Sequence, residues 1–230
     1  MTTEPGVSGR RSAADFSTAR LEAFSDGVFA IAITLLVLDL RVPEPDALHG
    51  ESLAHALAGQ WPAYFAYLVS FLVIGIIWIN HHALCGLARR VDRRTLFANL
   101  FLLLAVSVIP FPTRLLATYL TGRDSDAHTA AAVYAATMVV MGIAFSLLLL
   151  SFTRDARALR TPVAPADLRA ALGRFGVGGV CYLATLALAY VSPVAMLATH
   201  AVLAVYYCFD QLAPLRRSPS KGGSRPTPPA

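Results

Sequence analysis

Long apolar runs separated by short polar segments form the pattern of this chain from about residue 20 to residue 213. A helix needs roughly 20 apolar residues to cross the hydrocarbon of a bilayer, and several runs without Asp, Glu, Lys or Arg reach that length. The pattern predicts an all-α membrane protein with six spanning helices. Their expected ranges are 20–40, 61–84, 95–120, 129–152, 168–191 and 194–213.

The last two spans come from a single uncharged run, 175–209. As one helix this run would be about 52 Å long, which is too long for one crossing at an ordinary tilt. Ser192-Pro193 lies in its middle and predicts a turn, because proline disfavours helical geometry in the residue before it. We therefore expect two helices there.

Composition and charge placement agree with this topology. The 230 residues are 56% hydrophobic and 14% charged, with a mean hydropathy of +0.58, which excludes an ordinary soluble domain. With the N-terminus in the cytoplasm, only Arg41, Arg114 and Arg123 of the 19 basic residues fall in outer segments. The net charge of +5 is therefore explained by membrane topology, and no nucleic-acid partner is expected.

The two ends of the chain differ from the apolar middle. Residues 1–18 lack the apolar core and cleavage site of a signal peptide and are expected to form a cytosolic N-terminal arm. Residues 214–230 are rich in Pro, Ser and Gly and predict a disordered cytosolic tail. The six-helix transmembrane domain is expected between them, over residues 19–213.

The first predicted span begins with charges. Arg20, Glu22 and Asp26 lie in its first two turns, and the next twelve residues carry no charge. Glu22 and Asp26 are neighbours at i and i+4 and would repel each other if both were ionised and unpaired. Ionisable groups at this depth are costly and normally have partners nearby, so we expect donors from another helix.

The second predicted span supplies polar side chains at the same cytoplasmic level: Trp78, Asn80, His81 and His82. These groups can donate hydrogen bonds to Ser25 and Asp26. A metal site is the alternative, but adjacent histidines project about 100° apart, unlike the i, i+4 pair of a helical zinc motif. No metal is therefore expected.

The third predicted span combines polar Asn99 with Pro110 and Pro112. The prolines predict a kink in the outer part of the helix, and a broken helix lining a substrate site, as in transporters, is the other interpretation. The chain has no GxSxG, HExxH or P-loop pattern. We expect neither an enzyme nor a bound cofactor.

The stretch "RLEAFSDGVFAIAITLL" resembles the signature of the bacterial relatives of the lysosomal potassium channel, which belong to the transmembrane protein 175 family. The R-x-x-x-F-S-D pattern of that family matches Arg20, Phe24, Ser25 and Asp26. The later "WINHH" and the stretch from Asn99 to "PFPT" are also similar, so the resemblance extends through about residues 18–120.

The resemblance implies a homotetramer with one six-helix repeat per chain and a central pore lined by the first helix of each subunit. It implies a pore constriction at Ile31, Leu35 and Leu38, with Thr34 as a polar layer that contributes to selectivity. It also implies a network that holds the pore helix, and the motif and neighbouring helices place it at Arg20, Phe24, Ser25, Asp26, Trp78, His81, His82 and Asn99.

The leading hypothesis is a potassium-permeable channel in the cell membrane, with the lipid bilayer and monovalent cations as its partners. A proton-linked secondary transporter that uses Asp26 and His81 or His82 is the first alternative. A non-conducting helical scaffold is the second, because an aliphatic stripe on an apolar helix also serves helix packing or lipid contact.

Overall fold

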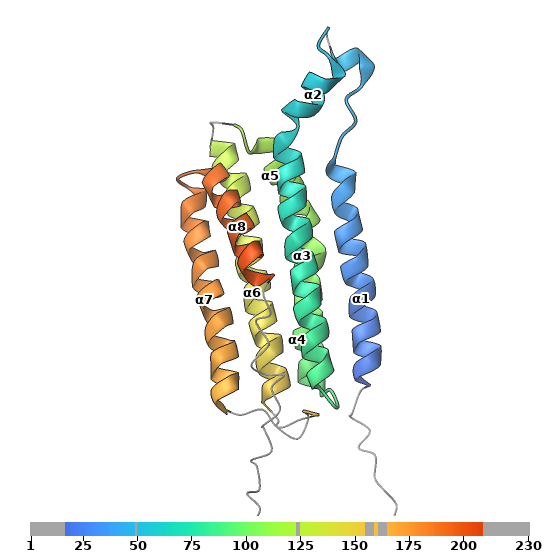
Figure 1. Cartoon of the computed structure of the whole chain (residues 1–230), viewed down its shortest axis with the longest axis vertical. Helices are drawn as coiled ribbons and strands as arrows, with labels where there is room; N and C mark the ends of the chain where they lie inside the picture. The colour runs from blue at the N-terminus through green and yellow to red at the C-terminus, as the bar shows by residue number, and fades with distance from the viewer. Residues whose placement is uncertain (1–16, 49, 123–124, 155–158, 161–164, 209–230) are drawn as a thin grey trace, which may run out of the picture.

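The computed structural model describes residues 17–48, 50–122, 125–154, 159–160 and 165–208. Within these ranges the chain is helical, and its long helices run side by side along one axis (Figure 1). Most of the predicted N-terminal arm and the whole predicted tail, 214–230, lie outside the described residues.

The helices follow one another in a simple order. They are α1 (Thr18–Leu35), the short 3-10 helices η1 (Leu36–Asp39) and η2 (Pro45–Leu48), α2 (Leu53–Gly59), α3 (Trp61–Leu87), α4 (Arg93–Val108), α5 (Pro110–Tyr119), α6 (Ser125–Thr153), α7 (Pro165–Ala189) and α8 (Pro193–Tyr207).

Five helical segments of the described chain are long and apolar enough to cross a membrane: Thr18–Asp39, Trp61–Leu87, Arg93–Tyr119, Ser125–Thr153 and Arg169–Ala189. They correspond to the first five predicted spans. The predicted turn at Ser192-Pro193 is present, and Ser192 Oγ caps α8 by accepting from the Ala195 N–H at 3.2 Å. The described part of α8 has only 15 residues, or about 22 Å, so the sixth span stays a prediction.

The third span is interrupted where its prolines begin. α4 ends at Val108 and α5 starts at Pro110, with Ile109 between them. Proline has no N–H to donate, and its ring collides with the preceding turn, so the break follows directly from the sequence. The break falls at the prolines, as predicted, in the C-terminal half of the span.

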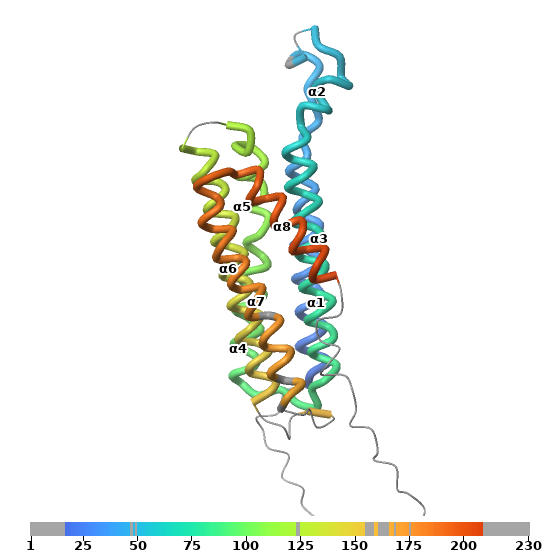
Figure 2. Tube along the Cα trace, turned by 60° about the vertical axis from the view of Figure 1, so that its left-hand side comes forward, coloured from blue at the N-terminus to red at the C-terminus, as the bar shows by residue number. Residues whose placement is uncertain are grey.

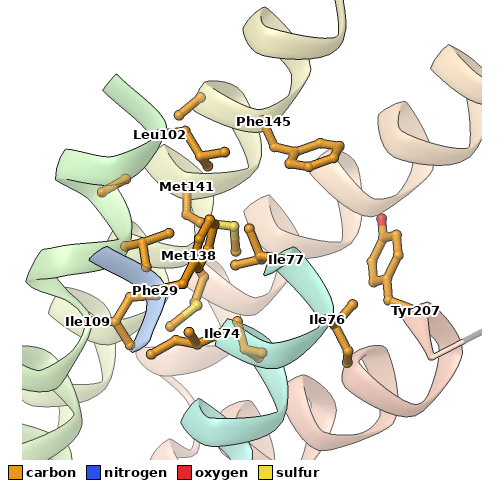
Figure 3. Close-up of a cluster of buried hydrophobic side chains, with 14 of the residues drawn as sticks. Phe29, Ile74, Ile76, Ile77, Leu102, Ile109, Met138, Met141, Phe145 and Tyr207 are labelled. Atoms are coloured by element: carbon orange, nitrogen blue, oxygen red, sulfur yellow. The ribbon is translucent and has the colours of Figure 1, made fainter. Parts of the chain in front are cut away.

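The core lies where α1, α3, α4 and α6 meet (Figure 3). Phe29 of α1 points into this cluster, among fully buried aliphatic and thioether side chains from the other helices. Examples of those side chains are Ile74, Leu102, Ile109 and Met138. One face of α1 is therefore fixed against the bundle, and the opposite face is left without a partner among the described residues.

α8 crosses from α7 towards α3 and packs against α3, α6 and α7 (Figure 2). The contact with α7 is close at Gly178, where an added Cβ would overlap the hydroxyl oxygen of Tyr207. We expect Gly178→Ala to displace the buried Tyr207 side chain and to destabilise the protein by about 1–3 kcal/mol, as overpacking does. Thermal unfolding in detergent measures the change.

Gly179→Ala is the matched control, because nothing lies within 4 Å of a Cβ at Gly179. Both variants gain the same helix propensity, so the difference between them isolates the overlap with Tyr207. Equal stabilities of the two variants would contradict the packing described here.

Asp92 caps the N-terminus of α4 in the turn after α3. Its Oδ1 accepts from the Thr95 backbone N–H at 2.8 Å and from the Thr95 hydroxyl at 2.7 Å. The backbone hydrogen bond, followed by the hydroxyl, holds the pKa of Asp92 below its ordinary value. We expect Asp92→Ala to lower stability by about 1 kcal/mol at neutral pH.

This capping contribution depends on pH with a definite sign. Because the pKa of Asp92 is lower in the folded protein, its stabilisation is complete above the unfolded value of about 3.9 and is lost as pH falls through the folded value. Unfolding temperatures of wild type and Asp92→Ala should therefore converge in acid. Asp92→Asn keeps a capping oxygen that does not titrate, so a strong loss of stability in this variant at neutral pH would argue against the cap.

Candidate functional site

α1 has two distinct faces. Its buried positions recur every three or four residues and continue into η1: Thr18, Leu21, Ser25, Phe29, Ala32 and Leu36. The predicted constriction residues lie on the other face, where Ile31 is 62%, Leu35 42% and Leu38 73% exposed. The described residues therefore leave an apolar stripe uncovered from Ile31 to Leu38, in the second half of the first span.

Thr34 lies on the same uncovered face. Its hydroxyl donates to backbone carbonyls of its own helix, with Oγ1 at 2.8 Å from Ala30 O and 3.0 Å from Ile31 O. A hydroxyl has one proton to donate and two lone pairs. The Thr34 oxygen can therefore still accept a hydrogen bond or contact a cation.

Behind the base of this stripe, three buried polar side chains connect α1, α3 and α4. Asn99 Nδ2 donates to Ser25 Oγ at 3.0 Å, and Asn99 Oδ1 lies 2.8 Å from His81 Nε2, which donates to it. Ser25 Oγ in turn donates to Leu21 O at 2.8 Å. Since all three side chains are almost completely buried, one asparagine satisfies polar groups on two other helices.

Two further contacts join α1 to α3 closer to the surface. Trp78 Nε1 donates to Asp26 Oδ1 at 2.8 Å, and His82 Nδ1 lies 2.6 Å from Glu22 Oε1. α1 and α3 are antiparallel, so residues four apart on one helix face residues four apart on the other. Each carboxyl group thus has its own partner, which offsets the repulsion expected between Glu22 and Asp26.

The structure corrects one expected donor. Among the described residues the amide of Asn80 donates within its own helix, to Ile76 O at 2.9 Å, and makes no hydrogen bond with α1. Asn80 is two positions from Trp78 and so projects about 200° away from it around the helix. Arg20 and Phe24 are exposed and take part in none of the contacts of this cluster among the described residues, and their role stays a prediction.

The sequence reasoning missed an ion pair at the other end of α1. Asp39 Oδ1 lies 3.8 Å from Arg114 Nε of α5, and the Asp39 side chain is only 13% exposed. The sequence did indicate that Asp39 has a partner, because an ionisable group within the boundary of a membrane span usually has one. The partner could not be read from the sequence, since it lies on a different helix.

No cluster of three or more His, Cys, Asp or Glu side chains suited to a metal ion occurs among the described residues. The described site consists of hydrogen-bonded polar side chains, an exposed aliphatic stripe and the hydroxyl of Thr34.

Comparison with known proteins gives consistent matches. The model of the family described as "Endosomal/lysosomal potassium channel TMEM175" matches residues 20–110. A protein of Streptomyces collinus named a potassium channel is 49% identical over 195 residues, which cover 85% of this chain and 93% of that protein. Another of Chamaesiphon minutus, also named a potassium channel, is 38% identical over 190 residues, covering 83% and 93%.

A solved structure has the same fold. The crystal structure of a lysosomal potassium-selective channel TMEM175 homolog from Chamaesiphon minutus superimposes with a TM-score of 0.75 and 37% sequence identity. The match covers 85% of this chain and 98% of that chain. Because the match extends over nearly the whole of these relatives, the chain belongs to the endosomal/lysosomal potassium channel TMEM175 family.

Proposed function

We propose that this protein is a potassium-permeable cation channel whose pore is lined by the α1 helices of four copies of the chain. The observation that carries the proposal is the uncovered stripe of Ile31, Leu35 and Leu38 on a helix whose other face is packed. The two bacterial relatives named potassium channels support the choice of ion.

In the proposed tetramer, each of these residues contributes to a ring of aliphatic side chains around the axis. Such rings narrow a pore and oppose ions by dewetting or by forcing partial dehydration. Potassium loses water more easily than sodium, because the larger ion of equal charge holds its hydration shell less strongly. The Thr34 oxygens would replace part of that water, which gives modest selectivity without a carbonyl filter.

The hydrogen-bonded cluster at the base of α1 is proposed to hold the pore helix in place. The side chains that bond Asp26 and His81 are Trp78 and Asn99, which do not titrate and so cannot pass a proton on. This favours a structural role over a proton relay for the network made of Ser25, Asp26, Trp78, His81 and Asn99.

We propose that the end of the bundle holding this cluster faces the cytoplasm. The starts of α1, α4 and α7 and the ends of α3 and α6 lie at that end (Figure 1). Arginines are concentrated there and are sparse at the opposite end, as expected for cytoplasmic segments. With α8 as the sixth crossing of the cell membrane, both termini of the chain would be cytoplasmic.

Purified protein in liposomes tests this function. We expect a potassium current down its gradient with discrete unitary events, and a reversal potential under potassium and sodium bi-ionic conditions that favours potassium. A current no larger than that of empty liposomes, across voltage and pH, would reject the channel. Saturable flux coupled to a proton gradient would instead identify a transporter.

A further inference from the structure

Asp39 and Leu38 are neighbours in the sequence but lie in different surroundings. Leu38 is the outermost residue of the proposed constriction and is 73% exposed, whereas the Asp39 side chain is 13% exposed. The carboxyl group therefore points towards the bundle and away from the uncovered face of α1.

The geometry of η1 explains this arrangement. The α-helical part of α1 ends at Leu35, and the next four residues form a 3-10 turn. In a 3-10 helix, side chains at i and i+3 eclipse each other, so Leu38 stacks over Leu35 on the exposed face. For the same reason Asp39 stacks over Leu36, which is fully buried.

The partner of Asp39 stands on a well-anchored helix. Arg114 follows Thr113, whose hydroxyl is 2.8 Å from Ser70 Oγ of α3 and also bonds Ile109 O. α5 packs directly against η1. Since a largely buried carboxylate needs a partner, the position of Arg114 favours one conformation of the turn.

We propose that Asp39, through its ion pair with Arg114, is a positioning residue that holds η1 in its 3-10 turn and so keeps Leu38 aligned with Leu35. The inference rests on the proposed function, in which Leu38 lines the pore. The ion pair determines where the outer ring of the constriction lies, and the carboxylate itself does not meet the ions.

Single-channel recording separates positioning from simple attraction of cations. Asp39→Asn and Arg114→Gln both break the pair, so we expect both to change potassium conductance in the same direction, by up to about fivefold, the size suited to a partly exposed ion pair. The conductance of the double variant should differ from that of wild type by no more than the conductance of either single variant does. If Asp39 only attracted cations, the two substitutions would act in opposite directions, and that result would overturn the proposal.

Arg41→Gln is the matched control, because Arg41 is an exposed arginine two residues from Asp39. It removes a nearby positive charge and leaves the ion pair of Asp39 with Arg114 intact, and we expect conductance close to wild type. A change equal to that of Arg114→Gln would show that the local charge matters and the pair does not.

A second measurement does not depend on conduction. Leu38→Cys is introduced with Cys208→Ser, since Cys208 is an exposed free thiol, and its labelling by a water-soluble thiol reagent is timed. We expect Asp39→Asn and Arg114→Gln, but not Arg41→Gln, to change this rate several-fold. Unchanged rates would overturn the positioning role even if the channel conducts, and changed rates would support it even if the channel proposal failed.

The side chain of Arg114 is 63% exposed, so Arg114→Gln is expected to fold normally. If Asp39→Asn gives too little protein, the Arg114→Gln variant alone still tests the proposal. Gel filtration in detergent provides the check on each variant.

Discussion

Ile31→Asn is expected to raise the potassium current of the reconstituted protein and to reduce its preference for potassium over sodium. In the proposed pore, Ile31 contributes to an aliphatic ring that ions cross only after losing water. An amide in this ring can hydrogen-bond to water and lowers the dehydration barrier for both ions. A barrier lower by about 1.4 kcal/mol corresponds to about a tenfold larger rate.

Ile143→Asn provides the matched control. Ile143 of α6 is the same residue type and is 51% exposed, compared with 62% for Ile31, but it is not on α1. The substitution should carry a similar cost of placing an amide in the membrane and leave conductance and selectivity unchanged. If Ile31→Asn conducted like wild type in bi-ionic recordings, α1 would not form the constriction.

Asn99→Ala is expected to give the largest loss of stability among single polar substitutions in the cluster, and to reduce the current as well. It removes the group that both donates to Ser25 and accepts from His81, so two buried partners on different helices lose a hydrogen bond. Leaving a buried group unsatisfied costs about 1–3 kcal/mol. Interhelical hydrogen bonds in membranes average about 0.6 kcal/mol each. We therefore expect the total loss of stability to lie near the lower end of the range of about 1–3 kcal/mol.

Thermal unfolding in detergent measures this loss, and Asn80→Ala is the comparison. Asn80 is a buried asparagine of α3 whose amide donates, among the described residues, to the backbone of its own helix. Its removal should cost less, because no other helix loses a partner. Equal losses would mean that the bridge from Asn99 to α1 and α3 contributes nothing to the bundle.

The sequence allowed much of the fold to be predicted, because crossing hydrocarbon imposes a minimum apolar length on each span. The five long spans and the break before Pro110 follow from this length and from proline chemistry alone. The predicted sixth span, 194–213, extends past the described part of α8, Pro193–Tyr207, and stays a prediction.

Partner assignment was less predictable. The cluster of polar side chains on α1 and α3 could be expected from the cost of unpaired charges in a membrane. Which donor meets which acceptor depends on helix rotation, so the sequence could not show that the Asn80 amide donates within its own helix or that Asp39 pairs with Arg114. A rotation of one residue, about 100°, moves a side chain to another neighbour.

The sequence by itself determined that this chain lies in a membrane, and that its first helix joins a polar base to a long uncharged stretch. Composition and periodicity are properties of each segment, so they need no knowledge of neighbours. Only the tertiary structure decided which face of α1 is packed and which is uncovered, that Asn99 and Trp78 contact α1, and that Arg114 pairs with Asp39 of η1. The physical reason is that hydrogen bonds and ion pairs between helices depend on distances of a few ångströms between residues far apart in the chain.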